Sequence, residues 1–437
     1  MAQSKGLTQR ASKFVAGLQF EALPEPVVER AKLAVLDSLG IMLAGARSSG
    51  TQLVRRHLRT LGTAGMATAV GAGLRLPAEF SALHNSLAGH IHDFDDVLLT
   101  SPSTCINPSV PVLASAIATA EEVGAGGKEV VTAYVAGIEL ACRLDVAIAV
   151  TVGTAAAAAS VLDLDVAKTR MALSIAAASG IAGHDGPGTA VSSYQAGLAA
   201  QNGVLAAKLA ALGVDAAPNA LDDAAPKRTK FGASCALVNA GISMRRYPGS
   251  PWLQSILDTL ILLTRDHDIK TDDVEEVRVT LPAKALAALP HDNPKNKASV
   301  QFLIAIALLD RAAGVLQLSD EAVKREDVAA MMRRVKAVRG PVRAGRYSLE
   351  VRLKDGRLLH NSKVSRDATW ASMTSAEVEQ KFRTCAAVVL DDRSIEQAIA
   401  AIRRMDTLRD VRELTRAVAG GQRTGQNRGT SVSQPRT

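Results

Sequence analysis

Aromatic side chains are scarce in this chain: Phe, Trp and Tyr make up only 3% of its 437 residues, although 47% of the residues are hydrophobic. A core with so few rings has to be built from Ala, Leu, Val and Ile, and helices that carry such small side chains can pack closely. We therefore predict a mostly helical protein. The chain is also longer than one hydrophobic core usually supports, so we expect two domains of unequal size.

The cysteines are few and widely spaced. Cys105, Cys142, Cys235 and Cys385 form no Cys-x-x-Cys pair, so the sequence indicates neither a zinc site nor a disulfide framework. A chain without a disulfide framework is typical of a reducing compartment, and we expect a cytoplasmic protein.

Long apolar runs are absent apart from one stretch. Residues 146–162 are uncharged, but this length is near the lower limit for a membrane span, and Asp145 and Asp163 flank a segment rich in Ala, Gly and Thr. We interpret it as a buried bundle helix and expect no membrane association. The N-terminus has no continuous apolar run after its positive charges and does not read as a secretory signal.

Motifs for nucleotides and nucleic acids are missing as well. The formal net charge is +8, but the basic residues are spread along the chain without the aromatic residues or the modules that nucleic-acid binding uses. No Gly-x-Gly-x-x-Gly or Walker-type loop is present to hold phosphates. We therefore expect no nucleic-acid partner, and a small anionic molecule fits the positive charge equally well.

Helical periodicity dominates the first part of the chain. After Pro24-Glu25-Pro26, apolar residues recur with the spacing of one buried helical stripe, and Gly45 is a plausible end. The stripe consists of Val28, Ala31, Val35, Leu39, Met42 and Leu43. Further helices are predicted at 112–122, 129–146, 166–178, 196–212 and, less clearly, 236–244. No strand-like alternation lies between them, so the first 245 or so residues are expected to be all-helical.

The pattern changes after residue 268. Residues 276–281 and 347–354 alternate apolar and polar side chains as half-buried strands do, and Asp355-Gly356 is a strong hairpin signal. Helices are predicted at 299–311, 326–335 and 375–389, and one long helix at 394–418. The expected fold is mostly α with an inserted α+β domain: a large helical-bundle domain, 1–265 completed by 391–418, plus a smaller lid-like α+β domain, 266–390. Residues 419–437 are expected to be a disordered tail.

The stretch from His90 to Asp96 places three carboxylates and two imidazoles within seven residues. Three acids this close cannot all ionise freely if they are even partly buried, and perturbed titration is a mark of reactive sites. A solvated helix end is the alternative. His90 and His92 are two residues apart and face different sides of a helix, so at most one of them would reach a cavity beside Asp93. His184 is a further candidate.

A metal site is not indicated. The His-x-His pair is similar to the start of the His-x-His-x-Asp-His motif of binuclear hydrolases, but Phe94 and Asp95 stand where that motif needs Asp and His. With two ligands missing, we expect no metal.

Nine segments, in order, resemble the MmgE/PrpD family. They are residues 14–20, 34–45, the His-Asp-Phe-Asp-Asp stretch 92–96, Asn107-Pro-Ser, Gly188-Thr189, Gln195-Ala-Gly197, Tyr247-Pro248, 299–302 and 410–414. The resemblance covers nearly the whole chain. It implies a large helical domain, a smaller α+β domain, a homodimer, and a cofactor-free lyase or isomerase, since the family includes 2-methylcitrate dehydratases, cis-aconitate decarboxylases and an iminodisuccinate epimerase.

The resemblance implies a remodelled site. Asp93 matches a cavity Asp of the family, but Val97 and Asn107 stand where the family has Thr and His, and Ser192 and Gln195 stand where it has Lys and His. Arg245 replaces a family Lys. Asn, Gln and Ser do not exchange protons near neutral pH, whereas Arg keeps its charge and can hold a carboxylate through two parallel hydrogen bonds.

Candidate roles follow from these positions. We expect Asp93, Tyr194 and His92 to be catalytic, with Asp93 or Tyr194 as the proton carrier. Arg245, Asn107, Ser192, Gln195 and Asp96 are the expected substrate-binding residues. Asp93, Tyr194 and Arg245 are expected to converge on one pocket between the domains. Two hypotheses stay open: a lyase or isomerase acting on a small polycarboxylate or related anion, and a noncatalytic homologue that binds an anion or serves as a dimeric scaffold.

Overall fold

A computed structural model describes residues 6–101, 104–144, 148–180, 190–224, 229–232, 235–239, 241–287, 289, 297–319, 321–340, 346–365 and 373–420. His184 and Gly188-Thr189 lie outside these ranges. So does all of the expected disordered tail from residue 421 on.

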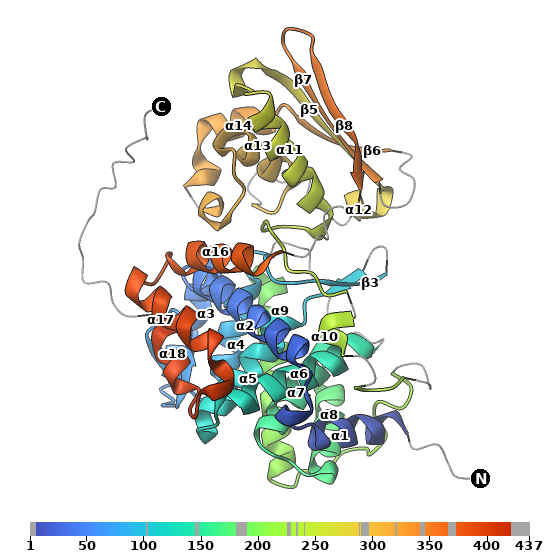
Figure 1. Ribbon diagram of the computed structural model, residues 1–437, viewed down its shortest axis with the longest axis vertical. Helices are drawn as coiled ribbons and strands as arrows, with labels where there is room; N and C mark the ends of the chain where they lie inside the picture. Colours follow the sequence, from blue (N-terminus) through green and yellow to red (C-terminus); the bar gives the residue numbers. More distant parts are fainter. Residues whose placement is uncertain are drawn as a thin grey trace.

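Two parts of unequal size are stacked along the long axis of the molecule (Figure 1). The larger part is built from helices and the smaller one from a sheet with helices packed on it, so the fold is mostly α with a smaller α+β portion, as predicted. The larger part contains α1 (Leu7–Gly17), η1 (Phe20–Ala22), α2 (Glu25–Gly45), α3 (Ser49–Thr60), α4 (Ala78–His90), α5 (Ser109–Val123), α6 (Gly127–Arg143), α7 (Ala149–Val161), α8 (Val166–Ser179), α9 (Ala190–Ala211) and α10 (Ala236–Asn239).

Helix α2 confirms the buried stripe predicted for it. All six apolar residues of the stripe are buried, and the helix ends at Gly45 as expected. A Cβ atom at Gly45 would lie 1.8 Å from the carbonyl oxygen of Ala88 in α4. Only glycine therefore allows α2 and α4 to approach this closely.

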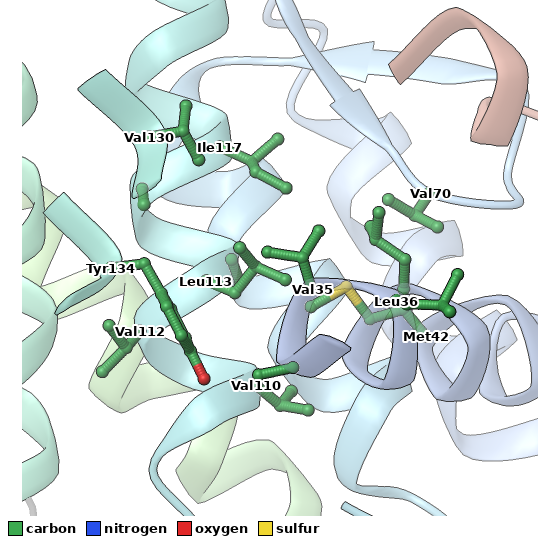
Figure 2. Close-up of a cluster of buried hydrophobic side chains, with 14 of the residues drawn as sticks. Val35, Leu36, Met42, Val70, Val110, Val112, Leu113, Ile117, Val130 and Tyr134 are labelled. Carbon is green, nitrogen blue, oxygen red and sulfur yellow. The ribbon is translucent and has the colours of Figure 1, made fainter. Parts of the chain in front are cut away.

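Small side chains fill the main core, as the composition predicts. Figure 2 shows Val35, Leu36 and Met42 of α2 near Leu113 and Ile117 of α5, with side chains of α6 beyond them. Helix α7 is buried along almost its whole length within the bundle. Among the described residues, no helix is both long and apolar enough to cross a membrane.

The expectation that the first 245 residues are all-helical is wrong in detail. Strands β1 (Ala67–Ala69) and β2 (Leu74–Leu76) form one antiparallel pair, and β3 (Leu98–Ser101) and β4 (Thr104–Ile106) form another. Strands of three or four residues are too short to show an alternating pattern. The helix predicted at 236–244 is also shorter than expected, because α10 ends at Asn239.

The smaller part contains a four-stranded sheet in the order β6-β5-β7-β8. Strands β5 (Val274–Leu281) and β7 (Arg346–Leu353) confirm the two predicted strands, and β8 (Leu358–Ser365) pairs antiparallel with β7. Gly356 has φ +86° in the turn between them, as the Asp-Gly signal predicts. Strand β6 (Val335–Arg339), which pairs parallel with β5, was not expected.

Several helices belong to the same part as this sheet. The helices that follow them belong again to the larger part. The α+β part contains α11 (Gln254–Asp266), α12 (Ala283–Ala287), α13 (Val300–Asp310), α14 (Glu326–Met332), and the short helices η2 (Pro251–Leu253), η3 (Thr271–Asp273), η4 (Val315–Leu318) and η5 (Ala322–Lys324). The chain then forms α16 (Ser375–Ala386), α17 (Asp392–Arg403), η6 (Met405–Thr407) and α18 (Arg412–Val418). The single helix expected at 394–418 is therefore wrong, because η6 interrupts it.

The domain limits at 265/266 and 390/391 stay predictions. Which hydrophobic core a helix joins indicates the domain to which it belongs. Val378 and Phe382 of α16 lie in the core of the helical part, whereas Leu257 and Leu260 of α11 lie in the core of the α+β part. In Figure 1, α16 lies on the helical part, on the side that faces the sheet domain. We therefore propose that the α+β domain begins near residue 250 and ends before α16.

Candidate active site

The acidic stretch forms a loop between α4 and β3, not a solvated helix end. Helix α4 ends at His90, and Asp93 adopts a left-handed backbone conformation with φ +47°. The Gly249 N–H donates to the carbonyl oxygen of Asp93 (2.8 Å), and Val97 forms a β-bridge with Ser243. A non-glycine residue is uncommon at positive φ, and it persists only where its surroundings fix it. The loop is thus held in one shape by the segment 243–249.

Arg245 connects two carboxylates of this loop. Its Nη1 donates to Asp93 Oδ1 (2.5 Å) and its Nη2 to Asp95 Oδ1 (2.8 Å), while its Nε donates to the carbonyl oxygen of Asp95. Asp95 Oδ2 in turn lies 2.8 Å from Nδ1 of His90. The Arg245 side chain is only 1% exposed. Asp93, Asp95, His90 and Arg245 therefore form one bonded cluster, which we call the Arg245 cluster.

The pairing decides the titration of the buried members. Burial alone would raise the pKa of Asp95, but the positive charges of His90 and Arg245 outweigh it and hold that pKa below its usual value. Burial would likewise lower the pKa of His90, yet Asp95 raises it above its usual value. The pairing therefore favours the charged form of both His90 and Asp95.

Asp96, the last acid of the loop, is bonded to the helical part. The Ser109 hydroxyl donates to one of its carboxylate oxygens and the Ser109 N–H to the other (3.2 Å), and the Ser109 hydroxyl lies 2.5 Å from that of Tyr134. Figure 2 shows Tyr134 among the apolar core residues, with its hydroxyl oxygen at the end of the cluster near Val110. Burial raises the pKa of Asp96 from 3.8 to about 7. This placement does not support the substrate-binding role expected for Asp96, because the residue is only 3% exposed.

Lys381, in the C-terminal helix α16, binds the acidic loop. Its ammonium group donates to the carbonyl oxygens of Phe94 (3.0 Å) and Arg245 (2.9 Å), and it lies 3.8 Å from the centre of the Phe94 ring. A cation over a ring face is attracted by the ring quadrupole. Helix α16 therefore holds the acidic loop and the Arg245 segment together.

A cavity of about 530 Å³ lies in front of this loop, lined by residues of both parts. His92 and Asp93 line it from the acidic loop, and the Asp93 side chain is 27% exposed. From the helical part, the end of α2 and the start of α3 contribute Ala44, Arg47, Ser48, Ser49 and Gly50, with Ile91, Ala190, Gly249 and Val388. From the α+β part come Lys297, Ala298, Val315, Leu316, Leu318, Ser319 and Glu321. Its volume is within the range of cavities that bury small ligands.

The predicted site residues divide into three groups. Asp93 and His92 line the cavity, as expected of catalytic residues. Arg245 contacts Asp93 but is not among the described residues that line the cavity, so this placement does not support its expected role as a direct substrate ligand. The structure thus brings Asp93 and Arg245 together, with Asp93 at the cavity and Arg245 on the far side of Asp93.

The other five predicted residues, Asp96 included, are not among the described residues that line the cavity. The Asn107 amide donates to the carbonyl oxygen of Asp96 (2.7 Å), which makes it part of the loop's own support. Ser192 and Gln195 are half-buried on α9, and Tyr194 is 37% exposed there. Tyr194 lies one helical turn beyond Ala190, which does line the cavity. Of the three residues expected to converge on one pocket, only Asp93 is among the described lining residues, and Arg245 reaches the site only through its bond to Asp93.

Two cationic residues line the cavity but were not predicted from the sequence as site residues. Arg47 lies between α2 and α3, directly before the Ser48 that precedes α3, and Lys297 lies two residues before Ser299, whose hydroxyl caps α13. A basic residue shortly before the start of a helix places a positive charge beside the helix N-terminus, where anions are favoured. That combination was the available signal in both places.

Metal ligation has no support in the part of the chain described. No three His, Cys, Asp or Glu side chains are grouped there so that they could hold a metal ion. All four cysteines have free thiols.

The fold and the site define a two-part, mostly helical protein with an acidic loop and a cavity at the junction. Residues 9–226 match the MmgE/PrpD N-terminal domain, and residues 247–407 match the MmgE/PrpD C-terminal domain. The chain therefore belongs to the MmgE/PrpD family, as its motifs predict.

Two curated relatives are similar over nearly the whole chain. The cis-aconitate decarboxylase of Mus musculus is 25% identical over 464 residues, which cover 95% of this chain and 94% of the relative. The cis-aconitate decarboxylase of Homo sapiens is 25% identical over 459 residues, covering 95% of each chain.

Proposed function

We propose that this protein is a cofactor-free lyase or isomerase that acts on a small carboxylate or related anion in the cavity between its two parts. The observation that carries the proposal is the position of Asp93 and His92, two groups capable of proton transfer, in the lining of a cavity that also contains Arg47 and Lys297. The family relationship to cis-aconitate decarboxylases supports lyase-type chemistry.

Asp93 is the residue best prepared for proton transfer. Its backbone is fixed in a left-handed conformation, one carboxylate oxygen is held by Arg245, and its side chain is still partly exposed at the cavity. A fixed group loses little freedom when it reacts, which favours catalysis. In an isomerase, Asp93 or His92 would remove a proton from the carbon next to a carboxylate, and a proton would return to the other face. In a lyase, the electron pair would instead expel the leaving group.

Arg47 and Lys297 supply the positive charges that a carboxylate substrate needs. Arg47 comes from the helical part and Lys297 from the α+β part, and each can pair with a carboxylate oxygen. Negative charge that develops on a substrate carboxylate during proton removal would be stabilised by these groups and by the nearby N-terminus of α3. Binding would also draw the two parts of the protein together.

The alternative, a noncatalytic protein, rests on the positions where this chain is expected to lack the site residues of the family. Val97 is completely buried, and its backbone pairs with Ser243, so it offers a substrate no polar group. Asn107 bonds within the loop. If these changes removed proton transfer, the chain would bind an anion in the cavity without converting it.

Hydrogen exchange in heavy water separates the two functions. The protein is incubated with a panel of mono-, di- and tricarboxylates of four to eight carbons, and loss of the proton signal next to each carboxylate is followed by NMR. Catalysis predicts exchange or turnover of at least one compound by the wild type, and at least a hundredfold less by Asp93→Asn. Asp272→Asn, an exposed position in η3 of the α+β part, is the matched control and should behave as wild type. Calorimetric binding of a carboxylate with no exchange and no turnover would establish the noncatalytic function instead.

A further inference from the structure

Helix α3 and the segments that flank it carry positive charge only. Residues 38–78 contain no Asp or Glu, but they include the arginines Arg47, Arg55, Arg56, Arg59 and Arg75. Arg47 directly precedes the first residue of the α3 N-terminus and lines the cavity, whereas Arg55 and Arg59 lie farther along the helix, outside the described lining. A positively charged surface therefore adjoins the cavity on the side of the helical part.

Three of these side chains, Arg47, Arg55 and Arg59, lie close together, and we call them the arginine cluster. Arg55 and Arg59 are four residues apart, so they are neighbours on one face of α3. Burial lowers the pKa of Arg55 below its usual value, and the positive charges of Arg59 and Arg47 lower it further. Arg55 still keeps its charge at neutral pH. Two like charges therefore act on a guanidinium group that is half-buried.

The arginine cluster has no carboxylate to balance it. Within the described part of the chain, none of its three side chains forms an ion pair or a hydrogen bond with another residue. Arg325, by contrast, bonds both Asp310 and Asp327. Like charges four residues apart destabilise a helix, and a charge partly removed from water is costly when it has no partner. The cluster therefore costs the fold stability, and a bound anion would remove that cost.

We propose that the arginine cluster binds a phosphate group beside the cavity. A phosphate group carries about two negative charges and three acceptor oxygens, so it can bond several guanidinium groups at once. A carboxylate carries one charge and would leave two of the three arginines unbalanced. Because Arg47 belongs both to the cluster and to the cavity lining, the phosphate is either a free ion or part of a ligand whose remainder enters the cavity. This site goes beyond the proposed function and does not depend on it.

Three probe compounds test the site by titration calorimetry at low ionic strength: inorganic phosphate, 6-phosphogluconate and gluconate. Both phosphate compounds should bind. Gluconate, which lacks the phosphate group, should bind at least about tenfold more weakly than 6-phosphogluconate. A 6-phosphogluconate affinity at least about tenfold above that of inorganic phosphate assigns the site to a larger ligand, and similar affinities assign it to the free ion. If neither phosphate compound binds, or if gluconate binds as tightly as 6-phosphogluconate, the proposal is wrong.

Single variants locate the binding. Arg55→Gln and Arg59→Gln should each weaken phosphate binding at least about tenfold, because each removes charged hydrogen-bond donors. Arg56→Gln is the matched control, since it removes the same charge from an exposed neighbouring position of α3, and it should change the affinity less than about threefold. Equal losses in Arg55→Gln and Arg56→Gln would show a general attraction to a positive surface and would contradict a specific site.

Stability without ligand distinguishes a binding role from a structural one. In phosphate-free buffer, Arg55→Gln should be at least as stable as the wild type in urea unfolding, because it removes a half-buried charge that two like charges repel. Added phosphate should stabilise the wild type and Arg56→Gln but not Arg55→Gln. A marked loss of stability in Arg55→Gln without phosphate would mean that Arg55 supports the fold instead. None of these measurements involves Asp93, so their outcome is independent of the test of the proposed function.

Discussion

Asp37 and Lys381 form an ion pair, 2.7 Å between Oδ1 and Nζ, in which the two side chains are only 2% and 5% exposed. Asp37 belongs to α2, near the start of the helical bundle, and Lys381 to α16, which the chain reaches after completing the α+β part. Since Lys381 also binds the carbonyl oxygens of Phe94 and Arg245, one ammonium group connects α2, α16 and both segments of the Arg245 cluster. The stability of the bundle and the shape of the site are therefore coupled.

We expect Lys381→Met to lower the free energy of unfolding by about 3–5 kcal/mol at neutral pH, because it leaves Asp37 buried without a cation. Burial already raises the pKa of Asp37, and Lys381 opposes that rise. Without Lys381 the carboxyl should protonate more readily, so the loss should shrink in acid. Urea unfolding at two pH values measures both effects.

A double variant serves as the control. Lys381→Met combined with Asp37→Leu removes both charges and should recover much of the lost stability, since a buried pair replaced by apolar residues is often neutral. A single variant within about 1 kcal/mol of wild type would show that the pair contributes only as an exposed salt bridge does.

Arg245 is expected to act as a positioning residue for Asp93. Arg245→Lys keeps the charge but cannot bond Asp93, Asp95 and the Asp95 carbonyl oxygen together. We expect it to remain folded and to reduce turnover of a cavity substrate at least about tenfold, with little change in its binding constant. A comparison of kcat with the calorimetric Kd checks this. A large loss of affinity with unchanged kcat would instead mean that Arg245 binds the substrate directly.

The fold could be predicted wherever a long segment carries its own pattern. The buried stripe of α2 repeats over several turns, and the β7–β8 hairpin is marked by Asp355-Gly356, so both were predictable. Strand β6 was not, because its five residues form a strand only through parallel pairing with β5, far away in the sequence. The break at η6 was missed because Met405 is apolar and buried, and it continues the periodic pattern across the interruption.

The site was predictable in composition but not in arrangement. The family motifs indicate Asp93 and Arg245 as neighbours, and the two side chains do bond. The sequence could not show that the guanidinium would be buried against Asp93 and Asp95, because that depends on a turn at Gly249 and on Lys381 of a distant helix. Charged groups close in space can satisfy one another instead of a ligand, and only the fold decides which happens.

We expect purified protein neither to dehydrate 2-methylcitrate nor to decarboxylate cis-aconitate at useful rates. This expectation rests on the resemblance described above, in which Val97, Asn107, Ser192 and Gln195 take the positions of family groups that line the substrate cavity. Losing one positioned proton-transfer group commonly costs a factor of about a hundred to ten thousand. Chromatographic assays of both acids over hours, with the protein at high concentration, test this. Robust turnover of either acid would refute the alignment of the site.

We expect a homodimer formed by the helical parts. Leu205 of α9 and Leu212 just after it are seven residues apart, so they share one face, and they are 43% and 83% exposed. Ala-rich helices that leave such apolar surface uncovered commonly bury it against a second copy. Sedimentation velocity should show a dimer at micromolar concentration, and Leu205→Glu should shift it towards monomer while Leu262→Glu does not. A monomeric wild type would exclude this interface.

Asp96 should make the stability of the protein depend on pH. Burial raises its pKa from 3.8 to about 7 in the folded protein, and Asp95 and Asp37 add to that rise. The folded state therefore holds this proton more tightly than the unfolded chain does. The stabilising contribution is complete below about pH 4, declines as the pH rises through the interval up to about 7, and is then constant. Each unit of pKa corresponds to about 1.4 kcal/mol, so the decline amounts to a few kcal/mol.

Asp96→Asn isolates this effect. The amide oxygen can still accept a hydrogen bond from Ser109 but carries no charge, so the variant should lose stability less steeply than wild type between about pH 5 and about pH 7. Because other groups titrate equally in both proteins, the difference between the two curves reports Asp96 alone. Urea unfolding at intervals of about half a pH unit gives those curves, and Asp272→Asn should follow the wild type. Parallel curves for Asp96→Asn and wild type would mean that Asp96 is ionised in the folded protein throughout this range, with Ser109 alone sufficient to hold its charge.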